Sequence, residues 1–454
     1  MATTSAPSSA SDRWGEQTRK AIENFPVSGE RIPPAMIEAL AMIKAECAAV
    51  NSDLGLIDGP IASAIQQAAD EVVSGAMGDQ FPVDVFQTGS GTSTNMNMNE
   101  VIANRAAEII GRDVHPNDHV NASQSSNDTF PSAARIAAVV QLTAALLPAL
   151  NSLRSSLLDL SRRHVDTVKM ARTHLMDAVP ITFGQEVGGW ARGVELSVQR
   201  VTSVLPRLAE LPIGGTAVGT GLNAPAGFGS LVTARLSKRT GCTFTEASNH
   251  FEAQSAQDAM VEAAATLKVV ALTLHKIAGD LRLLGSGPNG GLAEITLPAL
   301  QAGSSIMPGK VNPVIPEMIQ QVAAQVVGND ATITFAATMS TLQLNTAMPV
   351  TARSLLSSIR LLANATTLLD TRCIRGVEVD RERMRRNAER SPAIVTALAP
   401  RIGYDAASTL VRQAEEQGVS LAELIERAEL IGQADGSTSA SIVDWLLAMA
   451  RPND

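Results

Sequence analysis

The sequence predicts an all-α protein built around long apolar helices. Of its 454 residues, 45% are hydrophobic but only 3% are aromatic, a balance that favours close helix packing over a β-sandwich. Apolar residues recur with helical spacing over segments longer than ordinary globular helices. Some of these segments are apolar on nearly every face, so other helices must surround them.

Five long helices are expected in the middle of the chain. One subunit has difficulty enclosing five apolar helices, so the pattern favours a homo-oligomeric bundle. The uncharged residues 331–352 are long enough to cross a membrane, but their polar side chains would be costly in lipid. We expect this segment to be buried inside protein. The five predicted helices cover residues 131–164, 181–211, 254–284, 316–339 and 349–370.

The helical pattern divides the chain into three predicted domains. Residues 1–122 form a smaller, mostly helical domain in which Pro and Gly punctuate short helices. Residues 123–376 form the central bundle of long helices. Residues 377–454 begin with a mixed-sign run of Arg, Asp and Glu, typical of a solvated helix face, and form a small C-terminal helical domain.

Composition narrows the possible partners. The net charge of -9 excludes a basic face for nucleic acid, and no membrane partner is expected. Cys47, Cys242 and Cys373 are widely separated, so they suggest neither a disulfide framework nor a zinc motif. A reducing cytoplasm fits this cysteine usage best.

The loop at residues 303–313, GSSIMPGKVNP, interrupts the apolar pattern most sharply. It is too polar for a core and too patterned for a linker. Lys310 and Asn312 offer N–H donors to a carboxylate or phosphate, and the hydroxyls of Ser304 and Ser305 could exchange a proton. The alternative is a surface loop that caps the following helix.

Two polar stretches lie upstream. Residues 88–97 form a turn rich in hydroxyl and amide groups, which either donates hydrogen bonds to an anion or caps a helix. No strand-like run leads into this turn and no Gly-Lys-Ser/Thr follows it, so a P-loop is not expected. Ser125, Ser126 and Asn127 precede a long helix and place several donors at its positive end.

Histidines are scarce, and three of the six lie in polar stretches. His115 and His119 are four residues apart and could hold a metal on a helix, but Pro116 favours a turn that separates them, so no metal site is expected. His174 lies beside Arg172 and other polar groups in a break between long helices. A glycine-rich break follows at residues 214–223.

Three stretches far apart in the sequence therefore carry small hydrogen-bond donors. One of them adds Lys310, and a fourth stretch contributes His174. Their simplest common purpose is to bind a small dianion such as a dicarboxylate.

The loop at residues 303–313 matches the signature loop of the fumarase/aspartase superfamily, and the neighbouring motifs resemble those of class II (iron-independent) fumarases. The resemblance runs from Trp14 nearly to the C-terminus. It implies three mostly helical domains, a twenty-helix core in a homotetramer, and active sites that each take residues from three subunits. It implies no metal and no other cofactor.

The resemblance also implies reversible hydration of fumarate to (S)-malate through an aci-carboxylate, a step of the tricarboxylic acid cycle. Ser304 resembles the base that takes a proton from malate, His174 the residue that works on the water, and Glu317 the carboxylate that orients this histidine. The matching substrate-binding residues are Ser90, Thr92, Ser125, Ser126, Asn127, Thr173, Ser305, Lys310 and Asn312. A secondary dicarboxylate site matches Arg112, Asp113, Val114 and His115.

Two alternatives remain open. Aspartases share the loop and eliminate ammonia, but they tend to carry Gln at the position of His174 and Asn at that of His115. Ala302 and residues 314–316 look somewhat aspartase-like. A non-catalytic scaffold is disfavoured, because a scaffold need not keep Ser304 and the other catalytic residues.

Overall fold

The computed structural model describes the chain except for residues 1–11, 304, 398, 420, 422 and 425–454. The described chain is mostly helical, as predicted, and has only short strands. It divides into two compact units. Unit 1 comprises Met1–Ala149, Ser197–Leu272 and Gln321–Asn364, and unit 2 comprises Leu150–Leu196, Thr273–Gln320 and Ala365–Asp454. The three domains expected from the sequence stay a prediction.

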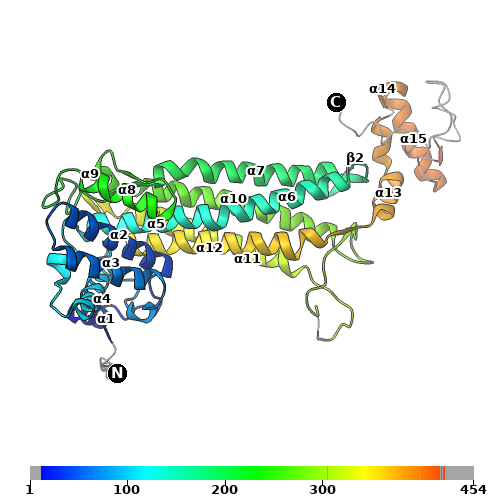
Figure 1. Cartoon of the computed structure of the whole chain (residues 1–454). Helices are drawn as coiled ribbons and strands as arrows, with labels where there is room; N and C mark the ends of the chain where they lie inside the picture. Colours follow the sequence, from blue (N-terminus) through cyan, green and yellow to red (C-terminus); the bar gives the residue numbers. More distant parts are fainter. Residues whose placement is uncertain (1–11, 304, 398, 420, 422, 425–454) are drawn as a thin grey trace. The chain divides into compact units, whose positions relative to one another are not determined.

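In unit 1, α3, α4, α5 and α8 pack against one central helix, α2, while α1 packs against α4 and α9 packs against α5 (Figure 1). Helix α2 is rich in Ala and apolar residues, begins with proline in its first turn, and is buried along most of its length against α3, α5 and α8. The helices of this group are α1 (Glu16–Asn24), α2 (Pro34–Asp53), α3 (Gly59–Val73), α4 (Thr92–Ile110), α5 (Ser126–Gln141), α8 (Phe228–Thr240) and α9 (His250–Ser255).

The five predicted long helices are confirmed, with ends shifted by a few residues. The first starts at Ser126 rather than Pro131, and α5 runs through a π-helical turn at Leu142–Leu146 into α6. Pro131 lies inside α5, beyond its first turn, so it does not mark the start even though an interior proline removes one backbone hydrogen bond. The long helices are α6 (Leu147–Arg163), α7 (Phe183–Leu208), α10 (Asp258–Leu284), α11 (Val314–Ala337) and α12 (Met348–Arg372).

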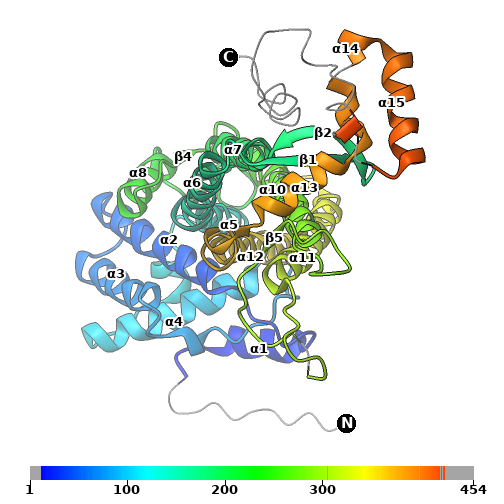
Figure 2. The same ribbon diagram turned by 90° about the vertical axis from the view of Figure 1, so that its right-hand side faces the viewer.

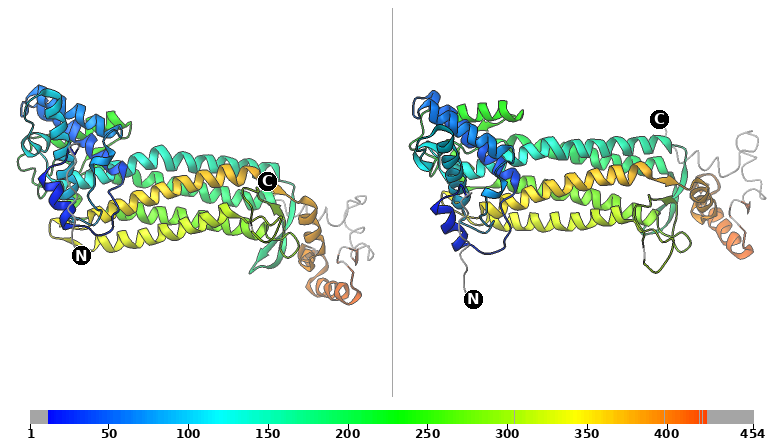
Figure 3. Two further views of the ribbon diagram at one scale, coloured as in Figure 1. Left: turned by 90° about the horizontal axis from the view of Figure 1, so that it is seen from below. Right: turned by 60° about the horizontal axis from the view of Figure 1, so that its bottom comes forward.

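In unit 2, segments of these helices form a bundle, seen nearly end-on in Figure 2. Polar contacts join its helices, and some of them are buried. Trp190 of α7 donates to Asp280 of α10 at 2.8 Å, and Ser152 of α6 donates to Asp370 of α12 at 2.6 Å. The connection between α10 and α11, which contains the polar loop, extends away from the helix ends (Figure 3).

The short strands are the part of the fold that the sequence did not predict. In unit 2, β1 (Val168–Thr173) and β2 (Met176–Thr182) form an antiparallel hairpin in which Val168 pairs with Thr182. A second small sheet joins β5 (Ile295–Thr296) to β8 (Glu378–Val379). Unit 1 contains the pairs β3 (Glu210–Leu211) with β4 (Thr245–Glu246) and β6 (Ser340–Thr341) with β7 (Leu344–Asn345).

The described residues that follow β8 in unit 2 are mostly helical. α13 packs against β1, and two further helices follow it. They are α13 (Arg381–Arg390), α14 (Ala399–Ile402) and α15 (Tyr404–Gln417).

The expectation that residues 331–352 are buried is wrong for the isolated chain. The segment comprises the end of α11, the β6–β7 hairpin and the start of α12. Phe335 is 67% exposed and Leu342 is 82% exposed. A different helix, Ser126–Arg163, is long and apolar enough to cross a membrane, but core helices of soluble proteins pass the same test.

Candidate active site

In unit 1, the structure brings two of the predicted polar stretches together. Asn95 on α4 donates from Nδ2 to the hydroxyl of Ser126 at 3.2 Å, which joins the stretch at residues 88–97 to the start of α5. The approach is close, since a Cβ added to Gly91 would lie 2.1 Å from the ring of Phe130 on α5. Gly91 also has a φ of 74°, so glycine is needed at this turn for both reasons.

The hydroxyls before α4 hold each other in place. Ser90 and Thr92 lie 2.9 Å apart, oxygen to oxygen. The hydroxyl of Thr88 accepts from the backbone N–H of Ser93 at 3.0 Å, although the N-cap residue itself is Gly91. Helix capping and anion binding are therefore compatible in this stretch. Thr88 caps a backbone N–H of α4, whereas the hydroxyls of Ser90 and Thr92 lie near the start of the helix.

The start of α5 is fixed by a capping box. The hydroxyl of Ser125 accepts from the backbone N–H of Asn127 at 3.3 Å, and Asp128 accepts from the backbone N–H of Ser125 at 2.9 Å. The side-chain amide of Asn127 donates to the carbonyl oxygen of Ala217 at 2.8 Å. Ser125, Ser126 and Asn127 thus lie at a helix N-terminus, where backbone N–H groups and the helix dipole favour an anion.

A buried lysine that sequence reasoning missed lies behind this group. Lys44 on α2 donates to the side-chain oxygens of Asn121 and Gln124, each at 2.9 Å, and Asn121 Oδ1 also accepts from Asn95 at 3.1 Å. Complete burial lowers the pKa of Lys44 to about 7, although Cys47 and Asp128 oppose this shift. The signal in the sequence was the single lysine of a helix that is rich in Ala and other apolar residues.

Asp128 is the second buried group that was missed. Its Oδ2 accepts backbone N–H bonds from Gly214 at 3.1 Å and Thr216 at 2.9 Å, so the glycine-rich break packs against the start of α5. Burial raises the pKa of Asp128 to about 6, while its N–H donors act in the opposite direction.

In unit 2, Thr173 and His174 lie at the tip of the β1–β2 hairpin, and both are exposed. His174 and Leu175 form the turn with φ angles of 55° and 62°, an uncommon conformation for residues with a side chain. Leu175 and Met176 beside them are 71% and 70% exposed. The hairpin therefore presents a histidine next to unpartnered apolar side chains.

A buried ion cluster anchors the base of this hairpin. The fully buried Glu294 accepts from Arg172 Nη2 at 2.6 Å and lies 3.3 Å from Lys169 Nζ, which also contacts Glu186 at 2.6 Å. Although burial opposes ionisation, the bond from Arg172 and the charge of Lys169 hold the pKa of Glu294 below its ordinary value. Asn387 of α13 donates to Glu294 at 3.2 Å.

The polar loop closes on itself at its base. The backbone N–H of Gly303 donates to the carbonyl oxygen of Lys310 at 2.9 Å, and Asn312 Nδ2 donates to the carbonyl oxygen of Gly303 at 2.8 Å. Ser305 and Lys310 are exposed. Ser304, the predicted base, lies outside the described residues.

Glu317 lies in the first turn of α11, with one carboxylate oxygen 4.0 Å from Arg282 Nη2. Among the described residues of unit 2, no hydrogen bond or ion pair joins His174 to Glu317, Lys310 or Asn312. The predicted orientation of His174 by Glu317 is thus not made by a contact within one chain, and their roles stay predictions.

The predicted secondary site lies after α4 in unit 1. Arg112 pairs with Asp58, Asp113 is exposed, and Val114 is buried. The turn expected after His115 is a π-helical turn, Pro116–Val120. The ring of His115 accepts from the backbone N–H of Asp118 at 3.0 Å, and the ring of His119 accepts from the backbone N–H of His115 at 2.9 Å, so each ring is bound to backbone. Within the described residues, no group of three or more His, Cys, Asp or Glu side chains is placed to hold a metal.

Comparisons with known proteins bear on what this arrangement does. A family model described as Lyase matches residues 6–328. Fumarate hydratase class II of Mycobacterium tuberculosis is 52% identical over 420 residues, which cover 92% of this chain and 88% of that protein. The Corynebacterium glutamicum protein of the same name is 51% identical over 413 residues, covering 91% of this chain and 87% of that protein.

Two solved structures share the fold over nearly the whole chain. The class II fumarase from Schistosoma mansoni matches with a TM-score of 0.92 at 36% identity, covering 98% of this chain and 97% of that one. The fumarate lyase:delta crystallin from Brucella melitensis bound to cobalt matches with a TM-score of 0.90 at 42% identity, covering 97% and 96%.

Proposed function

This chain belongs to the class II fumarate hydratase family of lyases, and from that premise we propose that it catalyses the reversible addition of water to fumarate, giving (S)-malate. The observation that carries the proposal is identity of 52% to a class II fumarate hydratase across 92% of the chain. Further support is that Ser304, His174 and Glu317 resemble the catalytic residues of this family.

In the direction from malate to fumarate, the proposed reaction begins at C3. Ser304 takes the C3 proton, and the electron pair moves into the neighbouring carboxylate as an aci-carboxylate. Lys310 and Asn312 donate to the additional negative charge, because fixed donors stabilise charge that develops in the transition state. The electron pair then forms the double bond as the C–O bond at C2 breaks. His174, oriented by Glu317, gives the departing hydroxide a proton, and water leaves.

The donor group of unit 1 is proposed to hold the substrate. This proposal is supported by the N-terminus of α5, where backbone N–H groups and neutral hydroxyl and amide side chains can bind a carboxylate. Asn95 and Asn121, backed by Lys44, restrain the position of Ser126. The proposed binding residues are Ser90, Thr92, Ser125, Ser126 and Asn127 from unit 1 and Thr173, Ser305, Lys310 and Asn312 from unit 2.

A homotetramer with active sites shared between three subunits is proposed as the working assembly. Its support is apolar surface that the single chain leaves exposed. The outward side of α11 carries no charged residue between Gln321 and Thr338 and exposes Val327 and Phe335. His174 lies beside the exposed Leu175 and Met176, which is expected of a hairpin that contacts another subunit.

We also propose that the enzyme acts in the cytoplasm, as part of the tricarboxylic acid cycle. The cysteines support a reducing compartment, because Cys47, Cys242 and Cys373 are all free and two of them are buried. The segment Arg112 to His115 is proposed as a secondary dicarboxylate site, supported by the exposed guanidinium of Arg112.

The test is to supply the purified protein with (S)-malate and, separately, with aspartate. Fumarate formation from malate without ammonia release from aspartate is expected. Brisk ammonia release from aspartate with inert malate would replace the proposal with an aspartate ammonia-lyase.

A further inference from the structure

We propose that a pocket in unit 2, lined by Arg172, Arg383, Arg386 and Arg390, binds a compact polyphosphate anion. We also propose that its occupancy lowers turnover by releasing the hairpin that carries His174. The binding site stands on the pocket alone, whereas the effect on turnover rests on the proposed function.

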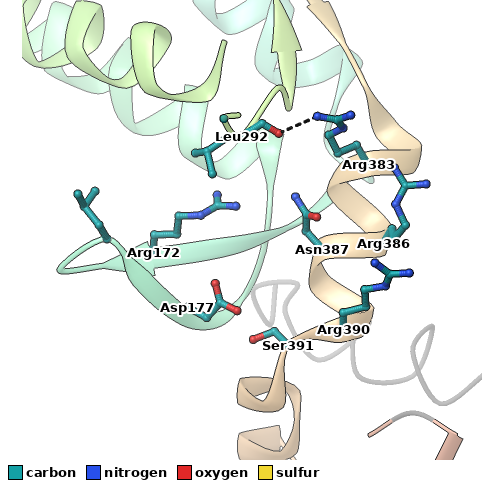
Figure 4. Close-up of a pocket in the computed structure, with 10 residues that line it drawn as sticks. Arg172, Asp177, Leu292, Arg383, Arg386, Asn387, Arg390 and Ser391 are labelled. Carbon is teal, nitrogen blue, oxygen red and sulfur yellow. Dashed lines mark hydrogen bonds between the residues drawn. The ribbon is translucent and has the colours of Figure 1, made fainter. Parts of the chain in front are cut away.

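The pocket lies between the β1–β2 hairpin and α13 (Figure 4). Its volume of about 530 Å³ is within the usual range for sites that hold small organic ligands. The hairpin contributes Arg172, Leu175 and Asp177, and Leu292 lies just before β5. Figure 4 shows the side chains of α13 lining the opposite wall.

The charge on the pocket wall is strongly positive. Four arginines line it, and Asp177 is the one acidic side chain among the lining residues. Arg172 is paired with Glu294, and Arg383 donates to the carbonyl oxygen of Pro288 at 2.9 Å. Within the described part of the chain, Arg386 and Arg390 make no hydrogen bond or ion pair. Two exposed guanidinium groups at the pocket are therefore available to bind an anion.

The spacing of the arginines along α13 places several positive charges close together. Arg383, Arg386 and Arg390 follow one another at spacings of three and four, so they share one face of the helix, where like charges repel. Elsewhere on the helix, Arg385 is paired with Glu389 at 2.8 Å. On the face that borders the pocket, Arg383 has Asp380 at 3.8 Å, whereas Arg386 and Arg390 have no acidic partner within the described residues. A bound anion would compensate these two charges.

A phosphate chain fits these groups better than a small dicarboxylate does. The planar fork of arginine matches two oxygens of one phosphate. Seven residues of helix separate Arg383 from Arg390, a rise of about 10 Å. Two or three linked phosphates can meet guanidinium groups spread over that length. Leu175 and Leu292 add an apolar side that an organic group on the phosphate could contact.

The pocket is connected to the proposed catalytic hairpin by two of its lining residues. Arg172 lies two positions before His174 on the same hairpin and is held by Glu294 at 2.6 Å. Asn387 lines the pocket and donates to the same carboxylate at 3.2 Å. An anion in the pocket competes with Glu294 for these donors, so binding weakens the anchor of the hairpin and lowers turnover.

The test is calorimetric titration of the full-length protein at low salt with inorganic triphosphate, without substrate. Binding is expected, and it should weaken as salt screens the arginines. The double variant Arg386→Gln, Arg390→Gln should lose at least about tenfold in affinity, since charged hydrogen bonds are removed. Arg385→Gln on the same helix is the matched control and should bind as the parent does.

Further measurements separate this site from its alternatives. Pyrophosphate and a nucleoside triphosphate are titrated in parallel, and tighter binding of the nucleotide would identify an organic ligand over inorganic polyphosphate. Because Thr173 lies on the same hairpin, saturating malate should weaken triphosphate binding to a limiting affinity without abolishing it. The double variant should keep its basal turnover and melting temperature while losing inhibition by triphosphate.

The binding proposal is overturned if triphosphate does not bind, if the double variant binds it equally well, or if malate displaces it completely. Binding without any change in turnover would overturn the regulatory part alone. A protein that binds triphosphate but is inert toward malate would defeat the proposed function and leave the site intact.

Discussion

At the scale of single residues, the proposed chemistry depends on one hydroxyl. A serine is a poor base unless nearby donors or cations stabilise its alkoxide. Replacing Ser304 with Ala should lower turnover at least about a hundredfold, the usual scale for losing a general base. Steady-state kinetics with malate measure this, and an unchanged melting temperature would show that the fold is intact. Near-normal activity would exclude Ser304 as the base. The control is Ser305→Ala, which should lower turnover less because Ser305 is proposed to bind substrate only.

Lys44 allows a prediction about pH. Because burial lowers its folded pKa to about 7, the folded protein binds fewer protons than the unfolded chain between this value and the ordinary lysine pKa. The free energy of unfolding therefore rises with pH across that window, because the cost of burying Lys44 without its proton decreases. It falls again as pH is lowered toward 7. Lys44→Met removes this dependence.

Melting of the parent and the Lys44→Met variant should be compared between about pH 7 and about pH 9. The parent should gain stability relative to the variant by up to about 1.4 kcal/mol per pH unit. Titration of other groups cancels in the difference between the two proteins. A difference that is constant with pH would mean that Lys44 keeps its ordinary pKa.

At the scale of elements, the β1–β2 hairpin depends on Glu294. Replacing it with Gln removes one of the two carboxylates beside Lys169 and Arg172 and leaves an uncompensated positive charge in a buried site. Breaking a buried ion pair costs about 3–5 kcal/mol. We expect Glu294→Gln to lower both the melting temperature and the turnover number.

The control for this substitution is Glu195→Gln on α7. Glu195 pairs with Arg192 at 2.7 Å, but both side chains are partly exposed. A surface pair of this kind is worth at most about 1 kcal/mol, so the control should melt within a few degrees of the parent. Equal losses in the two variants would contradict a special role for the buried cluster.

At the scale of the whole molecule, α11 points to assembly. It buries Ile319, Val326 and Ile333 at a spacing of seven residues, and its exposed residues from Gln321 to Ala337 are uncharged. Single chains rarely expose an uncharged helix face with a side chain as large as Phe335. This face suits contact with helices of other subunits.

Replacing Phe335 with Lys should break the assembly, because a charge at the centre of an apolar interface loses its hydration. Light scattering after size-exclusion chromatography should show a smaller particle, and turnover should fall with it. Val27→Lys, at an exposed position before α2, should change neither. A parent protein that is monomeric and fully active would end the proposal of shared active sites.

Much of the candidate site could be predicted because its signals are local. The capping box of Ser125 and Asp128 lies within four residues, and the polar loop stands out against apolar neighbours. The partners of these groups could not be predicted in the same way. Arg172 and Glu294 are 122 residues apart in sequence, and Lys44 and Asn121 are 77 apart.

The sequence by itself determined the five long helices, since helical periodicity depends on neighbours three and four residues away. Only the tertiary structure decided that residues 168–182 form a hairpin, that Lys44 and Asp128 lie buried behind the donors, and that Arg386 and Arg390 border a pocket. Burial and charge pairing depend on what the rest of the chain brings within a few ångströms, and local spacing carries no record of those distant neighbours.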